Sequence, residues 1–154
     1  MEQNEILTYR AQWAEIVAEI EKTGLRFSAN FKSGLCPYMQ WVRISALNPE
    51  DEPGISHNGM YVIIKIMMNE QKAEIFDFGH IWLTKEDQKA SYLAMCGANK
   101  AVKAVGGKWM KKQAYKNPED LAGKISKFWA GFIECLDKAT EGYPYKQMKV
   151  NIYC

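Results

Sequence analysis

Apolar residues recur every three to four positions in three stretches of the chain, as they do on the buried side of a helix. The first stretch predicts a helix from about Glu5 to Lys22, and the second predicts one from Thr84 to about Val105. The third predicts a helix that begins at Asn117-Pro118, a typical cap and first helical position, and that reaches about Lys138. Its apolar stripe consists of Ile125, Phe128, Trp129, Phe132 and Leu136.

Between the first two predicted helices, β-branched and aromatic residues alternate with polar ones. The runs 39–47, 59–68 and 72–83 predict three strands. The last two are joined by Asn69-Glu70-Gln71, which is short enough for a hairpin and therefore indicates an antiparallel meander. Residues 148–153 are typical of a fourth strand.

These elements predict one α+β domain over residues 1–154, with an antiparallel sheet of three to four strands packed against helices. The approximate order is α-β-β-β-α-α-β. A chain of 154 residues with 47% hydrophobic residues can bury a substantial core. The longest apolar run, 60–68, is interrupted by Lys65 and is far shorter than the roughly 20 residues that span a bilayer. The N-terminus lacks the pattern of a secretory signal. We therefore expect a cytoplasmic protein without a membrane partner.

Positive charge is concentrated in one segment. The stretch from Lys100 to Lys127 holds eight lysines against two acids, a local charge of +6, whereas the whole chain carries +2. An anionic partner responds to such a local patch rather than to the total charge. The segment therefore predicts a binding surface for an anion.

The densest part of this segment combines cations with aromatic rings. Lysines attract phosphates, and an exposed Trp or Tyr can stack on unpaired bases. The candidate residues for nucleic-acid or anion binding are Lys100, Lys103, Lys108, Trp109, Lys111, Lys112, Tyr115 and Lys116. Lys124 and Lys127 in the following helix would widen the patch. In the alternative interpretation, the lysines only keep a connector soluble and Trp109 anchors that connector to the core.

The predicted sheet supports a second hypothesis. Alternation along the strands puts Trp41, Arg43, Tyr61 and Lys65 at positions that need not face the core. An open sheet that displays aromatic rings and cations can bind single strands by stacking. The alternative is that helices cover these residues.

Catalytic chemistry has little support in the sequence, because His57 and His80 are the only histidines. Asp77 precedes His80 by three positions, which in a regular strand directs the two side chains to opposite faces, although a bulge at Gly79 would realign them. A hydrolase centred on these two residues is the third-ranked hypothesis. The four cysteines have no metal-site spacing and indicate reduced thiols. No catalytic residue, metal ligand or cofactor is predicted.

The sequence thus predicts a small binding protein that contacts nucleic acid or a nucleoprotein through its basic connector. The alternative is a non-catalytic protein-interaction module or inhibitor that binds an acidic protein surface. Trp41, Tyr61 or Trp109 would then serve as aromatic anchors. An exposed strand edge is also compatible with a homo-oligomer.

Overall fold

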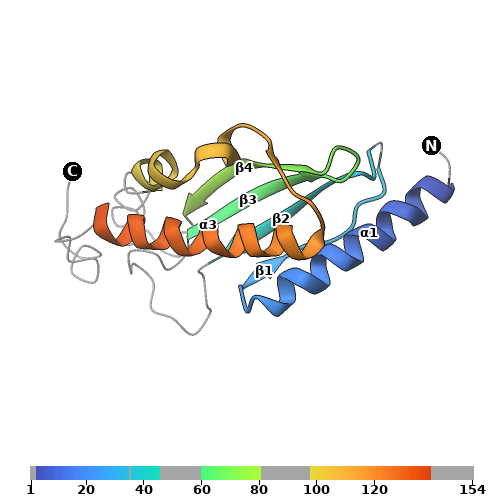
Figure 1. The fold of residues 1–154 in the computed structure, drawn as a ribbon, viewed down its shortest axis with the longest axis horizontal. Coiled ribbons are helices and arrows are strands. Elements are labelled where there is room, and N and C mark those ends of the chain that lie inside the picture. The colour runs from blue at the N-terminus through green and yellow to red at the C-terminus, as the bar shows by residue number, and fades with distance from the viewer. Residues whose placement is uncertain (1–2, 35, 46–59, 81–97, 140–154) are drawn as a thin grey trace.

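The computed structural model describes residues 3–34, 36–45, 60–80 and 98–139 (Figure 1). Helices and an antiparallel sheet alternate along the chain, which confirms the predicted α+β class. In chain order the elements are α1 (Gln3–Lys22), β1 (Phe27–Ser28), β2 (Met39–Ser45), β3 (Met60–Met67), β4 (Lys72–His80), the helical residues 98–105, the 3-10 helix η2 (Gly107–Met110), β5 (Gln113–Ala114) and α3 (Pro118–Ala139).

The sheet has five strands in the order β1-β2-β3-β4-β5, and each strand is antiparallel to its neighbours. The prediction of three to four strands missed β1 and β5. Each of these edge strands has two residues, too few for an alternating pattern to be recognised. The predicted strand 148–153 lies outside the described residues, as do His57 and residues 84–97 of the second predicted helix.

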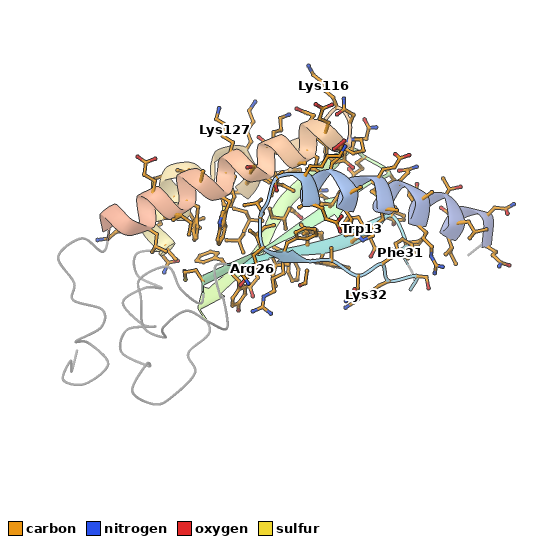
Figure 2. All side chains as sticks on the ribbon, turned by 90° about the horizontal axis from the view of Figure 1, so that it is seen from below. Trp13, Arg26, Phe31, Lys32, Lys116 and Lys127 are labelled. Carbon is orange, nitrogen blue, oxygen red and sulfur yellow. The ribbon has the colours of Figure 1, made fainter. Side chains whose placement is uncertain are left out.

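One face of the sheet is covered by α1 and α3, which lie side by side over it (Figures 1 and 2). Burial alternates along β2, where Gln40, Val42 and Ile44 are buried and their neighbours are partly exposed. The same alternation continues in β3, so one side of the sheet faces the helices. The largest fully buried apolar side chains are Ile20, Ile44, Met60, Ile64, Ile66, Met67, Leu121, Ile125, Phe132 and Leu136.

A β-bulge shifts the register between β3 and β4. Ile63 pairs with Asp77, whereas Ile64 pairs with Ile75, so Phe76 is an extra residue without a partner on β3. The bulge therefore lies at Phe76. A bulge at Gly79 would be needed to bring the side chains of Asp77 and His80 to the same face. The backbone positions of Asp77 and His80 alternate to opposite faces of the sheet, which argues against the hydrolase hypothesis.

Gln40 is the one polar side chain that is buried within the described residues, with 0% of its surface exposed. Its amide oxygen accepts a hydrogen bond of 2.9 Å from the Lys32 backbone N–H. Its amide nitrogen donates to the Lys32 carbonyl at 2.8 Å and to the Pro37 carbonyl at 2.9 Å. These three bonds hold the segment between β1 and β2 against the sheet and fix the backbone that carries Lys32.

Candidate anion-binding surface

The six lysines predicted to bind an anion are all exposed, but they belong to different elements. Lys100 and Lys103 lie in the helical residues 98–105, Lys108 lies in η2, and Lys111, Lys112 and Lys116 lie in the chain that leads through β5 to α3. The Lys112 ammonium lies 3.8 Å from Glu70 Oε2, in the turn between β3 and β4. This acid compensates part of the charge of Lys112.

The two aromatic rings of the predicted site are buried. Trp109 is 5% exposed and its ring centroid lies 5.7 Å from that of Phe128 on α3. Tyr115 is 6% exposed, and burial raises its pKa to about 12 because the charged phenolate is poorly solvated. Neither ring is open to a nucleic-acid base. The stacking role predicted for Trp109 and Tyr115 is therefore incompatible with their burial, and both residues anchor the connector to the core instead.

A cleft of about 400 Å³ lies between η2, β5 and α3. Lys108, Lys124 and Lys127 line it together with Gln113, and Trp109 and Phe128 contribute its aromatic lining. Lys124 and Lys127 are three positions apart on α3 and therefore share one side of that helix. The cleft brings Lys108 together with two lysines from a segment 16 residues further along the chain.

A second hollow, of about 460 Å³, follows the first turns of α3 and is lined by Lys116, Lys124 and Lys127 together with the acids Glu119 and Asp120. It adjoins the cleft, because Lys124 and Lys127 line both. We refer to Lys108, Lys116, Lys124 and Lys127 as the lysine groove. Figure 2 shows that the side chains of Lys116 and Lys127 point away from the sheet on the outer side of α3. The groove therefore faces away from the sheet.

The lysines of the groove differ in how far their charge is compensated. Lys124 Nζ donates to Asp120 Oδ2 and to the Ala114 carbonyl, both at 3.0 Å. Lys108, Lys116 and Lys127 form no ion pair with any acid in the described part of the chain. The charge of Lys116 is partly compensated, because it acts on Asp120 and because Glu119 and Asp120 line the same hollow. Lys108 and Lys127 are therefore the cations most available to a ligand.

The start of α3 is fixed by a cap. The Asp120 N–H donates to Asn117 Oδ1 at 2.8 Å, and the Leu121 N–H donates to the Asn117 carbonyl at 3.0 Å. Asp120 Oδ2 in turn accepts the backbone N–H of Lys116 at 2.8 Å. Asn117 is thus the N-cap and Pro118 the first helical residue, as the sequence predicts. The cap also fixes the backbone of Lys116 at the end of the groove.

The carboxylate of Asp120 makes the stability of this cap dependent on pH. The hydrogen bond from the Lys116 N–H, followed by that from the Lys124 ammonium, lowers the pKa of Asp120 below its usual value. A lowered pKa contributes stability above the unfolded-state pKa of about 4, and this contribution is lost as the pH falls through the folded-state pKa. We expect Asp120→Asn to have a lower melting temperature than the wild type at pH 7, with the difference narrowing below about pH 4.

Thermal unfolding followed by circular dichroism at several pH values would measure this difference. The control is Glu119→Gln, which removes the same charge from the adjacent exposed residue. A difference for Asp120→Asn that stays constant from neutral to acid pH would contradict the role of the charged carboxylate.

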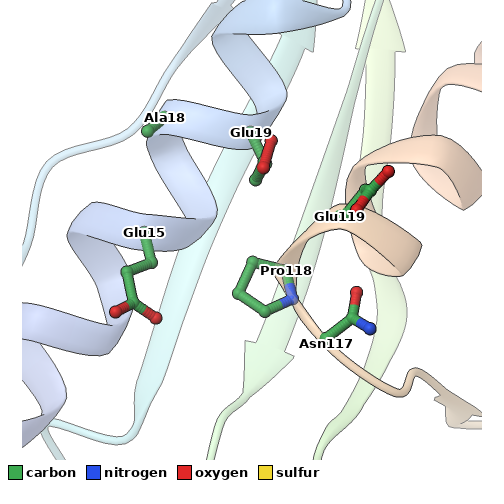
Figure 3. A pocket seen from close by; sticks show the side chains of 6 residues that line it. All are labelled: Glu15, Ala18, Glu19, Asn117, Pro118 and Glu119. Carbon is green, nitrogen blue, oxygen red and sulfur yellow. The ribbon is translucent and has the colours of Figure 1, made fainter.

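An acidic hollow borders the lysine groove. Glu15 and Glu19 of α1 and Glu119 of α3 line a space of about 380 Å³ together with Ala18, Asn117 and Pro118 (Figure 3). Glu19 already accepts a hydrogen bond of 3.1 Å from Lys22 Nζ. Within the described residues, no group of three or more His, Cys, Asp or Glu side chains could hold a metal ion. The acids of this hollow repel anions, and Glu119 lines both this hollow and that of Lys116, so acidic and basic side chains meet at the start of α3.

Trp41, Arg43, Tyr61 and Lys65 lie together on the sheet face opposite α1 and α3. The strand register pairs Trp41 with Lys65. It pairs Tyr61 with Ser45, two residues after Arg43 on β2, so Tyr61 and Arg43 are diagonal neighbours. All four residues are partly exposed, whereas their neighbours along the strands are buried. Sequence analysis identified these four residues but missed Phe76 and Lys32, which lie beside them. No periodic pattern marks either residue, because Phe76 belongs to the bulge and Lys32 to an irregular segment.

Comparison of the chain with protein-family models, with curated proteins and with solved structures gives no match. Within the described residues, no helix has both the length and the apolar character needed to cross a membrane. The chemistry of the surfaces described above is therefore the basis for a functional proposal.

Proposed function

We propose that this protein binds nucleic acid, and that the lysine groove contacts the phosphate backbone. The observation that carries the proposal is that Lys108, Lys116 and Lys127 line two adjoining hollows along α3 and form no ion pair in the described residues, with Glu119 and Asp120 as the acids of the second hollow. A row of ammonium groups gains affinity from a polyanion chiefly by releasing the counterions that surround its phosphates.

The composition of the groove favours contacts to phosphates over contacts to bases. Trp109 and Tyr115 are buried, so no ring of the connector is available for stacking. Lysine ammonium groups act as point charges that recognise phosphate without reading base edges. The groove therefore supports binding that depends weakly on nucleic-acid sequence and strongly on salt.

An acidic protein surface is the alternative partner for the same lysines. Protein interfaces usually depend on a few exposed aromatic or arginine anchors. Trp109, the aromatic anchor predicted in the connector, is buried, and every cation of the groove is a lysine. Phosphate binding needs only the charges that are present, so nucleic acid is the better-supported partner.

Salt dependence tests this proposal directly. We expect the affinity of the nuclease-treated wild-type protein for a labelled duplex to fall as salt rises from about 0.05 to 0.2 M. The slope of log K against log salt should be about −2 to −4, for two to four phosphate contacts. Fluorescence anisotropy measures this slope. A slope near zero, or no binding at the lowest salt, would contradict the proposal, and a pulldown that survives nuclease treatment would then identify an acidic protein partner.

A further inference from the structure

The face of the sheet opposite the helices presents an aromatic ring that is held in place but not covered. Phe76 is 58% exposed. The Trp41 and Phe76 rings form a T-shaped contact, with centroids 6.0 Å apart and ring planes at 76°. Lys65 Nζ lies 5.9 Å from the Phe76 centroid and is itself held by Glu74 Oε1 at 2.9 Å. Phe76 lies on the same face as Glu74, two positions before it, and these neighbours fix its position.

Arg43 is held next to this cluster by a second ring. The Arg43 guanidinium carbon lies 4.3 Å from the centroid of the Tyr61 ring, at the distance of a cation–π contact. Tyr61 itself lies against Gly79 of β4, where a Cβ atom would overlap its ring. Glycine at position 79 therefore allows Tyr61 to lie flat and to support Arg43.

A small hollow opens beside Arg43 and Trp41. It has a volume of about 170 Å³ and is lined by Ser28, Ala29, Asn30, Lys32, Trp41, Arg43 and Ile63. Among the described residues, this lining contains two cations and no acid. The sequence around it is similarly one-sided, because the stretch from residue 23 to residue 49 contains Arg26, Lys32 and Arg43 but neither Asp nor Glu. Such a site fits an anionic group of about the size of a phosphate.

The backbone around the hollow is preorganised. Gln40 fixes Lys32 through its hydrogen bonds to the Lys32 N–H and carbonyl. The Lys32 side chain projects on the side of the molecule opposite Lys116 and Lys127 (Figure 2). The hollow is therefore a separate surface from the lysine groove. The described acids nearest to the hollow do not fill it. Glu74 pairs with Lys65, and Asp77 lies beyond Ile63, two strands away from Arg43.

From this arrangement we infer that the open sheet face binds a single strand of nucleic acid, with a phosphate between Lys32 and Arg43 and a base stacked on Phe76. Trp41 links the phosphate subsite to the stacking subsite, because it lines the hollow and contacts the Phe76 ring. A base must be unpaired to reach this ring, so the face selects single strands over duplexes. The inference rests on the proposed function in taking nucleic acid as the ligand, but it concerns different residues.

The test compares Phe76→Ala with Leu7→Ala, which truncates an equally exposed apolar side chain on α1 (53% exposed). We expect Phe76→Ala to weaken binding of an oligo(dT) or oligo(U) strand of about ten nucleotides by roughly 5- to 100-fold, the usual effect of losing one stacked base. Binding of a duplex of similar length should change by less than about twofold, and Leu7→Ala should change neither.

Lys32→Gln tests the phosphate subsite in the same assay. It should weaken oligo(dT) binding by about tenfold at moderate salt, since one phosphate contact is lost. The control is Lys22→Gln, which removes the same charge from an exposed lysine at the end of α1. An equal loss in both variants would overturn the phosphate subsite, because the effect would then reflect total charge.

A third variant, in which Lys108, Lys116 and Lys127 are all replaced by glutamine, is compared with these single variants. The comparison tests the two surfaces separately. If Phe76→Ala binds single strands as the wild type does while the triple variant loses binding, the sheet inference is wrong and the lysine groove stands. If Phe76→Ala alone loses single-strand binding and the triple variant binds duplexes as the wild type does, the sheet inference stands and the groove is wrong. Equal losses for single strands and duplexes in Phe76→Ala would also overturn the sheet inference, because stacking requires unpaired bases.

Discussion

Replacing Lys108, Lys116 and Lys127 together by glutamine is expected to weaken binding of a duplex of about 20 base pairs by roughly 100- to 1,000-fold at about 0.1 M salt. Each ammonium group that neutralises a phosphate releases close to one counterion, and at this salt concentration each release contributes about tenfold in affinity. The slope of log K against log salt should become shallower by about 3 if all three lysines contact phosphates. Anisotropy titrations at several salt concentrations measure both quantities.

A matched control distinguishes the groove from a diffuse basic surface. Lys100, Lys103 and Lys111 are also exposed, and they are absent from the lining of the two hollows. Replacing these three by glutamine removes the same charge, but we expect a loss of less than about tenfold because only long-range attraction changes. Circular dichroism should show that both triple variants remain folded. Equal losses in the two variants would show that the groove geometry is irrelevant to binding.

Replacing Gln40 by methionine is expected to lower the free energy of unfolding by about 2–4 kcal/mol. Methionine fills a similar volume but cannot make the three hydrogen bonds of the amide to the Lys32 N–H, the Lys32 carbonyl and the Pro37 carbonyl. A buried backbone group that loses its partner costs about 1–3 kcal/mol. Burial of the apolar methionine side chain offsets part of this cost. The expected decrease in the free energy of unfolding is therefore about 2–4 kcal/mol rather than the full cost of all the lost hydrogen bonds.

Urea denaturation followed by fluorescence would measure the stability change, with Gln12→Met on the exposed surface of α1 as the control. A change of less than about 0.5 kcal/mol in Gln40→Met would contradict the anchoring role. The variant also connects stability to the sheet inference. If Gln40 positions Lys32, a folded Gln40→Met protein should bind oligo(dT) more weakly while its affinity for duplex stays unchanged.

The sequence by itself determined the elements whose residues follow a long local period. The predicted helix 117–138 matches α3 (Pro118–Ala139) within one residue at each end, because an Asn-Pro start and an apolar stripe act within a few turns. The three predicted strands correspond to β2, β3 and β4. Strands β1 and β5 exist because a neighbouring strand pairs with them, and two residues carry too little pattern to predict such pairing.

For the candidate surfaces, the sequence determined where charge is concentrated, and the tertiary structure decided which groups meet and which rings are open. Trp109 and Phe76 both occur near lysines in the sequence, yet Trp109 packs against Phe128 and is buried, whereas Phe76 lies beside Trp41 on the other face of the sheet and is exposed. Likewise, Lys108 and Lys127 converge only because η2 packs beside α3. Exposure and convergence depend on contacts between segments distant in the chain, and no local pattern of residues encodes those contacts.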